Sequence, residues 1–135
     1  MRNRPPEIER FLAKKSFAVV GASNDRAKYG NKVLRCYQQH GFPVVGVNPK
    51  LTVVEGVPCH PSLAAVPGPA RSVSVVAPPV AAATIVADAI AAGVTDLWFQ
   101  PGAEDAHAVA AARAAGISVI ADGPCVLVAL GFRDE

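Results

Sequence analysis

A small polar loop follows the first apolar run of the chain and carries residues suited to holding an anion. Small side chains let backbone N–H groups approach a phosphate, the helix that follows adds the dipole of its N-terminus, and Lys and Arg add positive charge. We interpret the loop as a pyrophosphate site. The alternative is that its glycines only form turns and its cations are solvated. The candidate ligand-binding residues here are Gly21, Ala22, Ser23, Asn24, Arg26, Lys28 and Tyr29.

This loop does not match two common nucleotide-binding motifs. Positions 21, 23 and 26 are Gly, Ser and Arg, so the dinucleotide motif GxGxxG fails at two of its three glycines. The phosphate-binding motif GxxxxGK(S/T) is also missing from the loop, so NTPase chemistry has no support. The position of the loop after the first strand still favours a ligand site.

Three further segments follow apolar runs and would lie at the same edge of a parallel sheet. The first contains Asn48, Pro49 and Lys50, where an NAD-binding fold usually has an acid; a lysine there suits a phosphorylated ribose, as in CoA or NADP. An ordinary surface lysine after a turn proline is the alternative. The other two segments offer a flat apolar wall for an adenine and an amide beside a glycine. Their candidate residues are Ala77, Pro78, Gln100 and Gly102.

Short valine-rich runs alternate with longer helical stretches that end in glycine, a pattern typical of a parallel sheet with crossover helices. We expect an α/β fold with a doubly wound, five-stranded parallel sheet and one extra short strand at 52–54. The five strands are expected at 17–21, 44–47, 72–76, 96–100 and 117–121. Helices are expected at 6–14, 31–40, 79–92 and 104–115, with a helical turn near 62–66.

The composition indicates one globular domain. At roughly 100 to 200 residues per domain, 135 residues make a single domain over 1–135, in which 1–15 form an N-terminal helix and tail. A formal net charge of +2 gives no reason to expect nucleic acid or an anionic membrane as a partner. Three cysteines without a CxxC pair, and the lack of a targeting or membrane-spanning pattern, predict a cytoplasmic location.

Several motifs in a fixed order resemble a known family. They are Gly21-Ala22-Ser23, Lys28 to Val33, Val47-Asn48-Pro49-Lys50, Glu55-Gly56, Pro61-Ser62-Leu63, Trp98 to Gly102, Ala114-Ala115-Gly116 and Ala121-Asp122. Together they resemble the small bacterial CoA-binding proteins, relatives of the CoA-binding domain of the succinyl-CoA synthetase alpha subunit. The resemblance covers residues 10–128 and implies a Rossmann-like, nucleotide-binding fold.

The resemblance also implies a role for each candidate segment. The loop 21–24 would hold the pyrophosphate, Lys50 the phosphorylated ribose, Ala77 and Pro78 the adenine region, and 100–102 the floor near the pantetheine. The end of the chain departs from the family pattern. Relatives usually carry an Asp-Arg-Cys run and then a Glu-His pair, whereas this chain reads Asp122-Gly123-Pro124-Cys125 and then Val128-Ala129-Leu130.

No set of residues predicts catalysis or a metal site. The synthetase relatives work through a phosphorylated histidine in another domain, and His40, His60 and His107 have no recognisable acid partner. Cys125 follows the last strand, where a mixed disulfide with the CoA thiol is a hypothesis, although a buried structural cysteine is the commoner case. We expect a module that binds CoA or acyl-CoA, without catalysis and with an unidentified protein partner. The alternatives are an NADP-binding protein and a ligand-free interaction domain.

Overall fold

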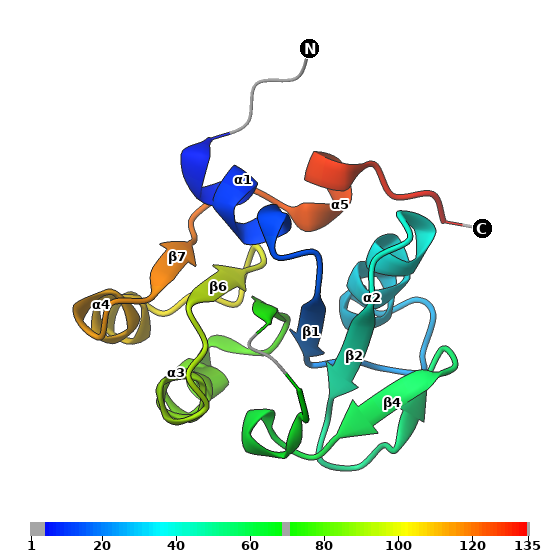
Figure 1. Cartoon of the computed structure of the whole chain (residues 1–135), viewed down its shortest axis with the longest axis horizontal. Coiled ribbons are helices and arrows are strands. Elements are labelled where there is room, and N and C mark those ends of the chain that lie inside the picture. Colours follow the sequence, from blue (N-terminus) through cyan, green and yellow to red (C-terminus); the bar gives the residue numbers. More distant parts are fainter. Residues whose placement is uncertain (1–4, 69–70, 135) are drawn as a thin grey trace.

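The computed structural model describes residues 5–68 and 71–134, and seven strands in these ranges form one sheet (Figure 1). The strand order is β3-β4-β2-β1-β5-β6-β7, and every neighbouring pair is parallel except β3 with β4. The central strand, β1, lies between β2 and β5. After β1 the chain first adds β2 on one side, and it later adds β5, β6 and β7 on the other side. The strands are β1 (Phe17–Val20), β2 (Val44–Val47), β3 (Val53–Val54), β4 (Val57–His60), β5 (Ser72–Val75), β6 (Asp96–Phe99) and β7 (Ser118–Ile120).

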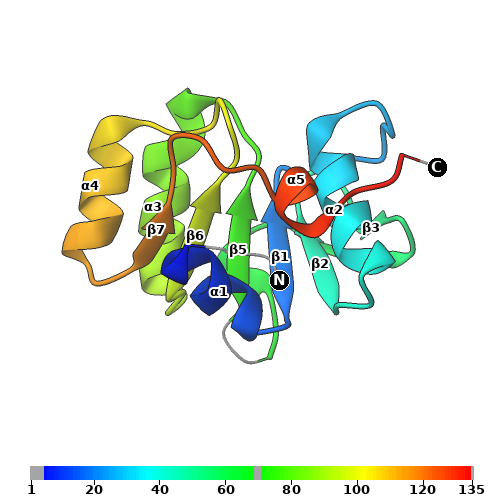
Figure 2. The ribbon, with the colours of Figure 1, turned by 90° about the horizontal axis from the view of Figure 1, so that it is seen from above.

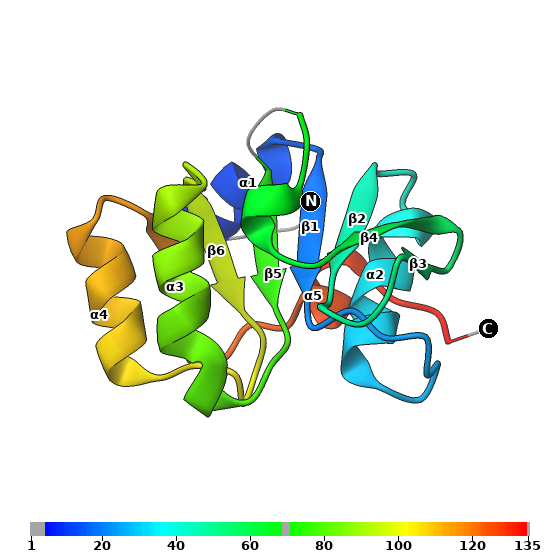
Figure 3. The ribbon, with the colours of Figure 1, turned by 90° about the horizontal axis from the view of Figure 1, so that it is seen from below.

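Helices cover both faces of the sheet, as Figures 2 and 3 show from opposite sides. One face carries α1 (Pro6–Ala13), α2 (Tyr29–Gln39) and α5 (Val126–Leu130). The other carries α3 (Ala82–Ala91), α4 (Ala106–Ala114) and the short turn η1 (Leu63–Ala65), and a second short turn, η2 (Pro79–Ala81), leads into α3. This is the doubly wound, Rossmann-like α/β fold that the sequence predicts.

Two hydrophobic cores form on the two faces because successive side chains of a strand point in opposite directions. Phe17 and Val19 of β1 pack with α1, α2 and α5, whereas Ala18 belongs to the core beneath α3 and α4. The Phe17 ring stacks on Tyr37 of α2, with ring centroids 4.2 Å apart. The sheet therefore anchors α2, whose first turn borders the predicted ligand loop.

All five predicted strands are present, but the sheet has two strands beyond them and not only the one extra strand expected. The expected extra strand is β3, but β4 follows it after the turn at Glu55 and Gly56 and pairs with both β3 and β2. The sequence of β4 contains Pro58 and has little apolar alternation, so it carries no strand pattern of its own. β4 is the second strand from the edge, and only its residues Cys59 and His60 pair with β2. Pro58 faces Val53 of β3 and lies outside the parallel pairing with β2, so its missing N–H is tolerated there. The short helix α5 was not expected either.

Three backbone segments meet without intervening side chains at the carboxyl end of β1. Gly21 has φ +95°, and a Cβ at this position would overlap the carbonyl oxygen of Val76, which follows β5. A Cβ at Gly30, in the first turn of α2, would overlap the carbonyl oxygen of Gly21. The loop after β1 is thus held between the start of α2 and the end of β5.

Replacing Gly21 by Ala should destabilise the protein far more than the same change at Gly41. Both glycines have positive φ, so each Ala variant carries the left-handed backbone cost of about 1–2 kcal/mol. A Cβ at Gly41 meets nothing within 4 Å, whereas one at Gly21 meets backbone. We expect Gly21→Ala to lose about 3 kcal/mol or more beyond Gly41→Ala in urea unfolding. Equal losses would contradict the close approach.

Candidate functional site

A cavity of about 490 Å³ opens at the carboxyl ends of the central strands, where an open α/β sheet binds its ligands. The loops after β1, β2, β5 and β6 contribute to its wall, together with the first turn of α2. Most of the candidate residues from the sequence lie in this wall. Its lining residues are Gly21, Ala22, Ser23, Lys28, Tyr29, Gly30, Asn48, Val76, Ala77, Pro78, Gln100, Pro101, Gly102 and Ala103.

Two asparagine side chains hold the carbonyl groups of the loop after β1. Asn31 Nδ2 donates to the Ser23 oxygen at 2.8 Å, and Asn48 Nδ2 donates to the Ala22 oxygen at 2.9 Å. Carbonyl oxygens that accept these bonds are not presented to an anion. The first turn of α2 adds backbone N–H groups that have no partner within the helix. The loop is therefore arranged to accept negative charge.

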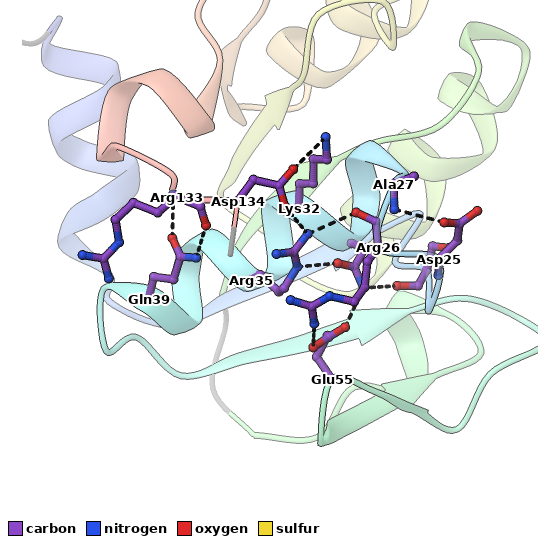
Figure 4. Close-up of polar contacts among 11 residues, drawn as sticks. Asp25, Arg26, Ala27, Lys32, Arg35, Gln39, Glu55, Arg133 and Asp134 are labelled. Atoms are coloured by element: carbon purple, nitrogen blue, oxygen red, sulfur yellow. Dashed lines mark hydrogen bonds and ion pairs between the residues drawn. The ribbon is translucent and has the colours of Figure 1, made fainter.

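The cations of this loop have different positions. Lys28 lines the cavity, but Arg26 lines neither of the cavities that the described residues form around this edge. Arg26 Nη1 instead pairs with Glu55 Oε1 at 2.7 Å, as Figure 4 shows. Asn24 also points away, because its Nδ2 donates to the Val53 oxygen at 3.2 Å. Asn24 ties the loop to β3, and Arg26 ties it to the turn after β3. Each bond joins residues 29 positions apart in the sequence, so no local pattern predicts it.

Glu55 belongs to a polar network beneath the loop, which extends to the end of the described chain (Figure 4). Asn31 Nδ2 donates to Glu55 Oε2 at 2.9 Å, and Arg35 Nε donates to Asn31 Oδ1 at 2.6 Å. The buried Arg35 guanidinium also donates to the Arg26 carbonyl and pairs with Asp134 at 3.2 Å. The hydrogen bond from Asn31, together with the charges of Arg26 and Arg35, lowers the pKa of Glu55 below its usual value.

A second cavity, of about 340 Å³ and largely apolar, adjoins the first on the α3 face. The two share Gly21, Asn48 and Ala77 in their walls. Pro49 lines this second cavity, whereas the exposed Lys50 lines neither. The remaining wall was not predicted from the sequence, although the Pro61-Ser62-Leu63 motif lies in it. That wall comprises Val20, Val47, Pro61, Ser62, Leu63, Ala81, Thr84, Ile85 and Asp88.

Gln100 is the buried amide of the first cavity, with 1% of its surface exposed. Its Oε1 accepts a hydrogen bond from the Val126 backbone at 2.9 Å, which fixes the start of α5. Its Nε2 has no hydrogen-bond partner among the described residues. A buried amide donor of this kind usually has a partner in the protein or an ordered water, so Nε2 is free to donate to a water or a ligand group at the cavity.

The helix expected at 104–115 begins later, so the loop after β6 is longer than predicted. Gly102 lines the cavity, but its N–H donates to Glu104 Oε1 at 2.7 Å. The helix α4 begins only at Ala106, where Asp105 accepts from the Ala108 N–H at 3.0 Å. The backbone of Gly102 therefore shapes the cavity without offering a free helix terminus to a ligand.

His40, at the end of α2, makes a structural contact. His40 Nε2 lies 3.1 Å from the Gly131 oxygen, which ties α2 to the end of α5. No group of three or more His, Cys, Asp or Glu side chains there is arranged to hold a metal ion. Nor is any helix among the described residues long and apolar enough to span a bilayer.

Residues 15–131 match the family of CoA binding domains. The chain belongs to the CoA-binding domain family. This CoA-binding domain is 37% identical over 60 residues to acetate–CoA ligase (ADP-forming) I of Archaeoglobus fulgidus. That alignment covers 44% of the domain but only 9% of the ligase, so the chain spans a small part of the ligase.

Solved structures resemble the same domain. A conserved hypothetical protein from Pyrococcus furiosus has a TM-score of 0.79 at 36% identity, covering 84% of this chain and 97% of that chain. A dinucleotide-forming acetyl-coenzyme A synthetase 1 from Candidatus Korarchaeum cryptofilum has a TM-score of 0.73 at 27% identity. The second match covers 83% of this domain and 27% of the synthetase. The CoA-binding domain is thus similar both to a whole small protein and to one part of a larger one.

Glu55→Gln should lower the free energy of unfolding by about 1–2 kcal/mol at pH 7, because it removes the charge from the hydrogen bonds with Asn31 and Arg26. The lowered pKa of Glu55 means that this stabilisation is present above the unfolded value of about 4.3. It is lost as the pH falls through the lower folded-state pKa. In urea unfolding, the difference in free energy of unfolding between wild type and Glu55→Gln should therefore shrink as the pH falls below about 4.3.

The exposed Glu7 of α1 supplies the control. Glu7→Gln removes one carboxylate without touching the network beneath the loop, so its effect measures the general change in charge. The measured quantity is the loss in free energy of unfolding relative to wild type. If this loss for Glu55→Gln stays constant at low pH, or equals the loss for Glu7→Gln, the Glu55 charge does not hold the loop.

Proposed function

We propose that this domain binds coenzyme A or an acyl-CoA as a module without a catalytic step of its own. The observation that carries the proposal is the pair of adjoining cavities, with a shared wall at Gly21, Asn48 and Ala77. The cavity beneath the start of α2 is lined by polar and apolar groups alike, and the one beside α3 is largely apolar. CoA has the matching order of parts: an adenine, a pyrophosphate and a long pantetheine arm. The family and the ligase relatives support the same ligand.

Each part of CoA has a complementary segment. The pyrophosphate would lie against 21–23 and the first turn of α2, where Lys28 adds charge. The adenine would enter the apolar cavity beside Pro49 and Ala77. The pantetheine arm would extend along 100–103 towards Tyr29, with the buried Gln100 amide available to one of its carbonyl groups. We therefore retain the candidate residues of the cavity as ligand contacts and assign Asn24 and Arg26 to support of the loop.

Lys50 is the candidate reader of the ribose phosphate. It follows Pro49, which lines the apolar cavity, and its own N–H is fixed by Asn48 Oδ1 at 2.8 Å. An exposed lysine at the rim can reach a phosphate outside the cavity. NADP, with its phosphate on the 2′ oxygen of the ribose, is the second candidate that Lys50 favours. The lack of GxGxxG in the loop argues against it.

The setting proposed for this module is the cytoplasm, where CoA and its thiol are kept reduced. The ligase and synthetase relatives are larger proteins of which the chain matches a part. We therefore also propose a protein partner that uses the bound CoA. Pull-down experiments with the CoA-bound protein would identify it.

Thermal unfolding with a panel of nucleotides tests the proposed ligand. A ligand at about 100 times its Kd adds roughly 2.7 kcal/mol of stability, which shifts the midpoint of a domain of this size by several degrees. We expect CoA and acetyl-CoA to give this shift, dephospho-CoA a smaller one, and NAD none. A larger shift with NADP than with CoA would favour the dinucleotide, and no shift with any nucleotide would leave a domain without this ligand.

Lys50→Glu should weaken CoA binding about tenfold or more in calorimetry, because a phosphate contact is replaced by repulsion. Its affinity for dephospho-CoA should change much less. Lys15→Glu is the matched control, since Lys15 precedes β1 at the opposite edge of the sheet and is also exposed. If the two variants lose the same affinity, only the general charge of the protein matters and Lys50 does not read the phosphate.

A further inference from the structure

A thiol lies beside the end of the first cavity, where the loop after β7 meets α2. The Tyr29 hydroxyl is in hydrogen-bond contact with the Cys125 thiol, and Tyr29 lines the cavity. Burial and the contact with Cys125 raise the pKa of Tyr29, so its hydroxyl keeps its proton. Cys125 is partly exposed, unlike Cys36 and Cys59, which are buried. It is therefore the most accessible of the three thiols.

An independent feature points to a ligand at the same place. The Gln100 side chain lines the cavity and is almost completely buried, yet its Nε2 has no partner among the described residues. Its Oε1 holds the N–H of Val126, the residue next to Cys125. An amide or thioester carbonyl that accepts from Nε2 would thus lie close to the Cys125 backbone. In CoA, the last amide of the pantetheine arm is separated from the sulfur by two methylene groups.

We propose that Cys125 is a modification site at which this domain captures the CoA sulfur as a mixed disulfide. The proposal rests on the proposed function, since it needs CoA in the cavity with its arm directed towards Tyr29 and Gln100. Trp98 Nε1 donates to the Pro124 oxygen at 3.0 Å, which fixes the residue before Cys125. The backbone on both sides of Cys125 is thus fixed through Pro124 and Val126, and Tyr29 contacts the thiol itself.

The reaction is a thiol–disulfide exchange with CoA disulfide as the oxidant. Cys125 loses its proton to solvent, and its thiolate attacks one sulfur of the CoA disulfide. The sulfur–sulfur bond of the reagent breaks as the bond between Cys125 and CoA forms. The second CoA leaves as a thiolate and takes up a proton. One disulfide is consumed and one is formed, so the electrons balance and a thiol reductant reverses the step.

The two other cysteines are poorly placed for this exchange. Cys36 is fully buried on α2, where its thiol donates to the Val126 oxygen at 3.9 Å, and burial raises its pKa to about 12. Cys59 lies on β4, and burial raises its pKa as well. Since the thiolate is the reacting form, both remain weak nucleophiles at neutral pH. They serve as internal controls for nonspecific oxidation.

Intact-protein mass spectrometry tests the capture. The reduced protein is incubated with CoA disulfide or with glutathione disulfide, and the modified cysteine is identified by peptide mapping. We expect the mass of each chain to increase by that of one CoA less two hydrogen atoms, with the adduct on Cys125. Dithiothreitol should remove the adduct completely. The rate with CoA disulfide should exceed that with glutathione disulfide about tenfold or more and should saturate. Cys125→Ser should abolish the adduct, and Cys59→Ser should not.

Calorimetry with reduced CoA, in the presence of reductant, separates this proposal from the proposed function. Reversible CoA binding without an adduct on Cys125 would overturn the capture and leave the binding function intact. Loss of both would overturn both. An adduct spread over several cysteines, or formed equally fast with glutathione disulfide, would also overturn a directed capture.

Gln100→Glu tests the role of the buried amide as a positioning group. Glutamate keeps the acceptor for the Val126 N–H but removes the Nε2 donor. The added negative charge acts on the exchange with either reagent, whereas the lost donor affects only CoA disulfide. We therefore expect the ratio of the rate with CoA disulfide to the rate with glutathione disulfide to fall. A variant that slows both reagents equally would show that Gln100 affects only the general access to Cys125.

Discussion

The site depends on the direct packing of backbone against backbone at the end of β1. Gly21 contacts the carbonyl group of Val76, and Gly30 contacts that of Gly21, with no room for a side chain at either position. This packing fixes the distance between the start of α2 and the end of β5. Both cavities have Gly21 in their walls, so the polar and the apolar halves of the site are placed by the same contact.

Charge is distributed around this contact in two layers. Lys28 lines the cavity, while Arg26 and Arg35 are engaged beneath it with Glu55, Asn31 and Asp134. The inner layer neutralises its own charges through ion pairs and hydrogen bonds. It therefore shapes the loop, and the local positive field at the cavity comes from Lys28 and from the backbone of α2. The small net charge of the whole chain is consistent with such local use of cations.

The five main parallel strands and the position of the cavity could be predicted from the sequence, because buried parallel strands and glycine-ended helices leave clear local patterns. The strand β4 could not, since its pairing with β2 compensates for Pro58 and for its weak apolar pattern. The Arg26 side chain points away from the cavity because it pairs with Glu55. The wall of the apolar cavity forms because η1 packs beside α3. These features arise from contacts between distant segments, which residue types and spacing alone do not encode.

The contacts of the turn between β3 and β4 limit where this protein can accept an insertion. Exposed hairpin tips commonly accept insertions during evolution and engineering. Here the tip residue Glu55 is bound through its carboxylate to Arg26 and Asn31 and through its carbonyl oxygen to Gln38 Nε2 at 2.9 Å. A segment inserted at the turn would move Glu55 away from these three partners and break the hydrogen bonds. The hairpin at the edge of the sheet, the outermost part of the fold, is thus one of the places least suited to a graft or a peptide tag.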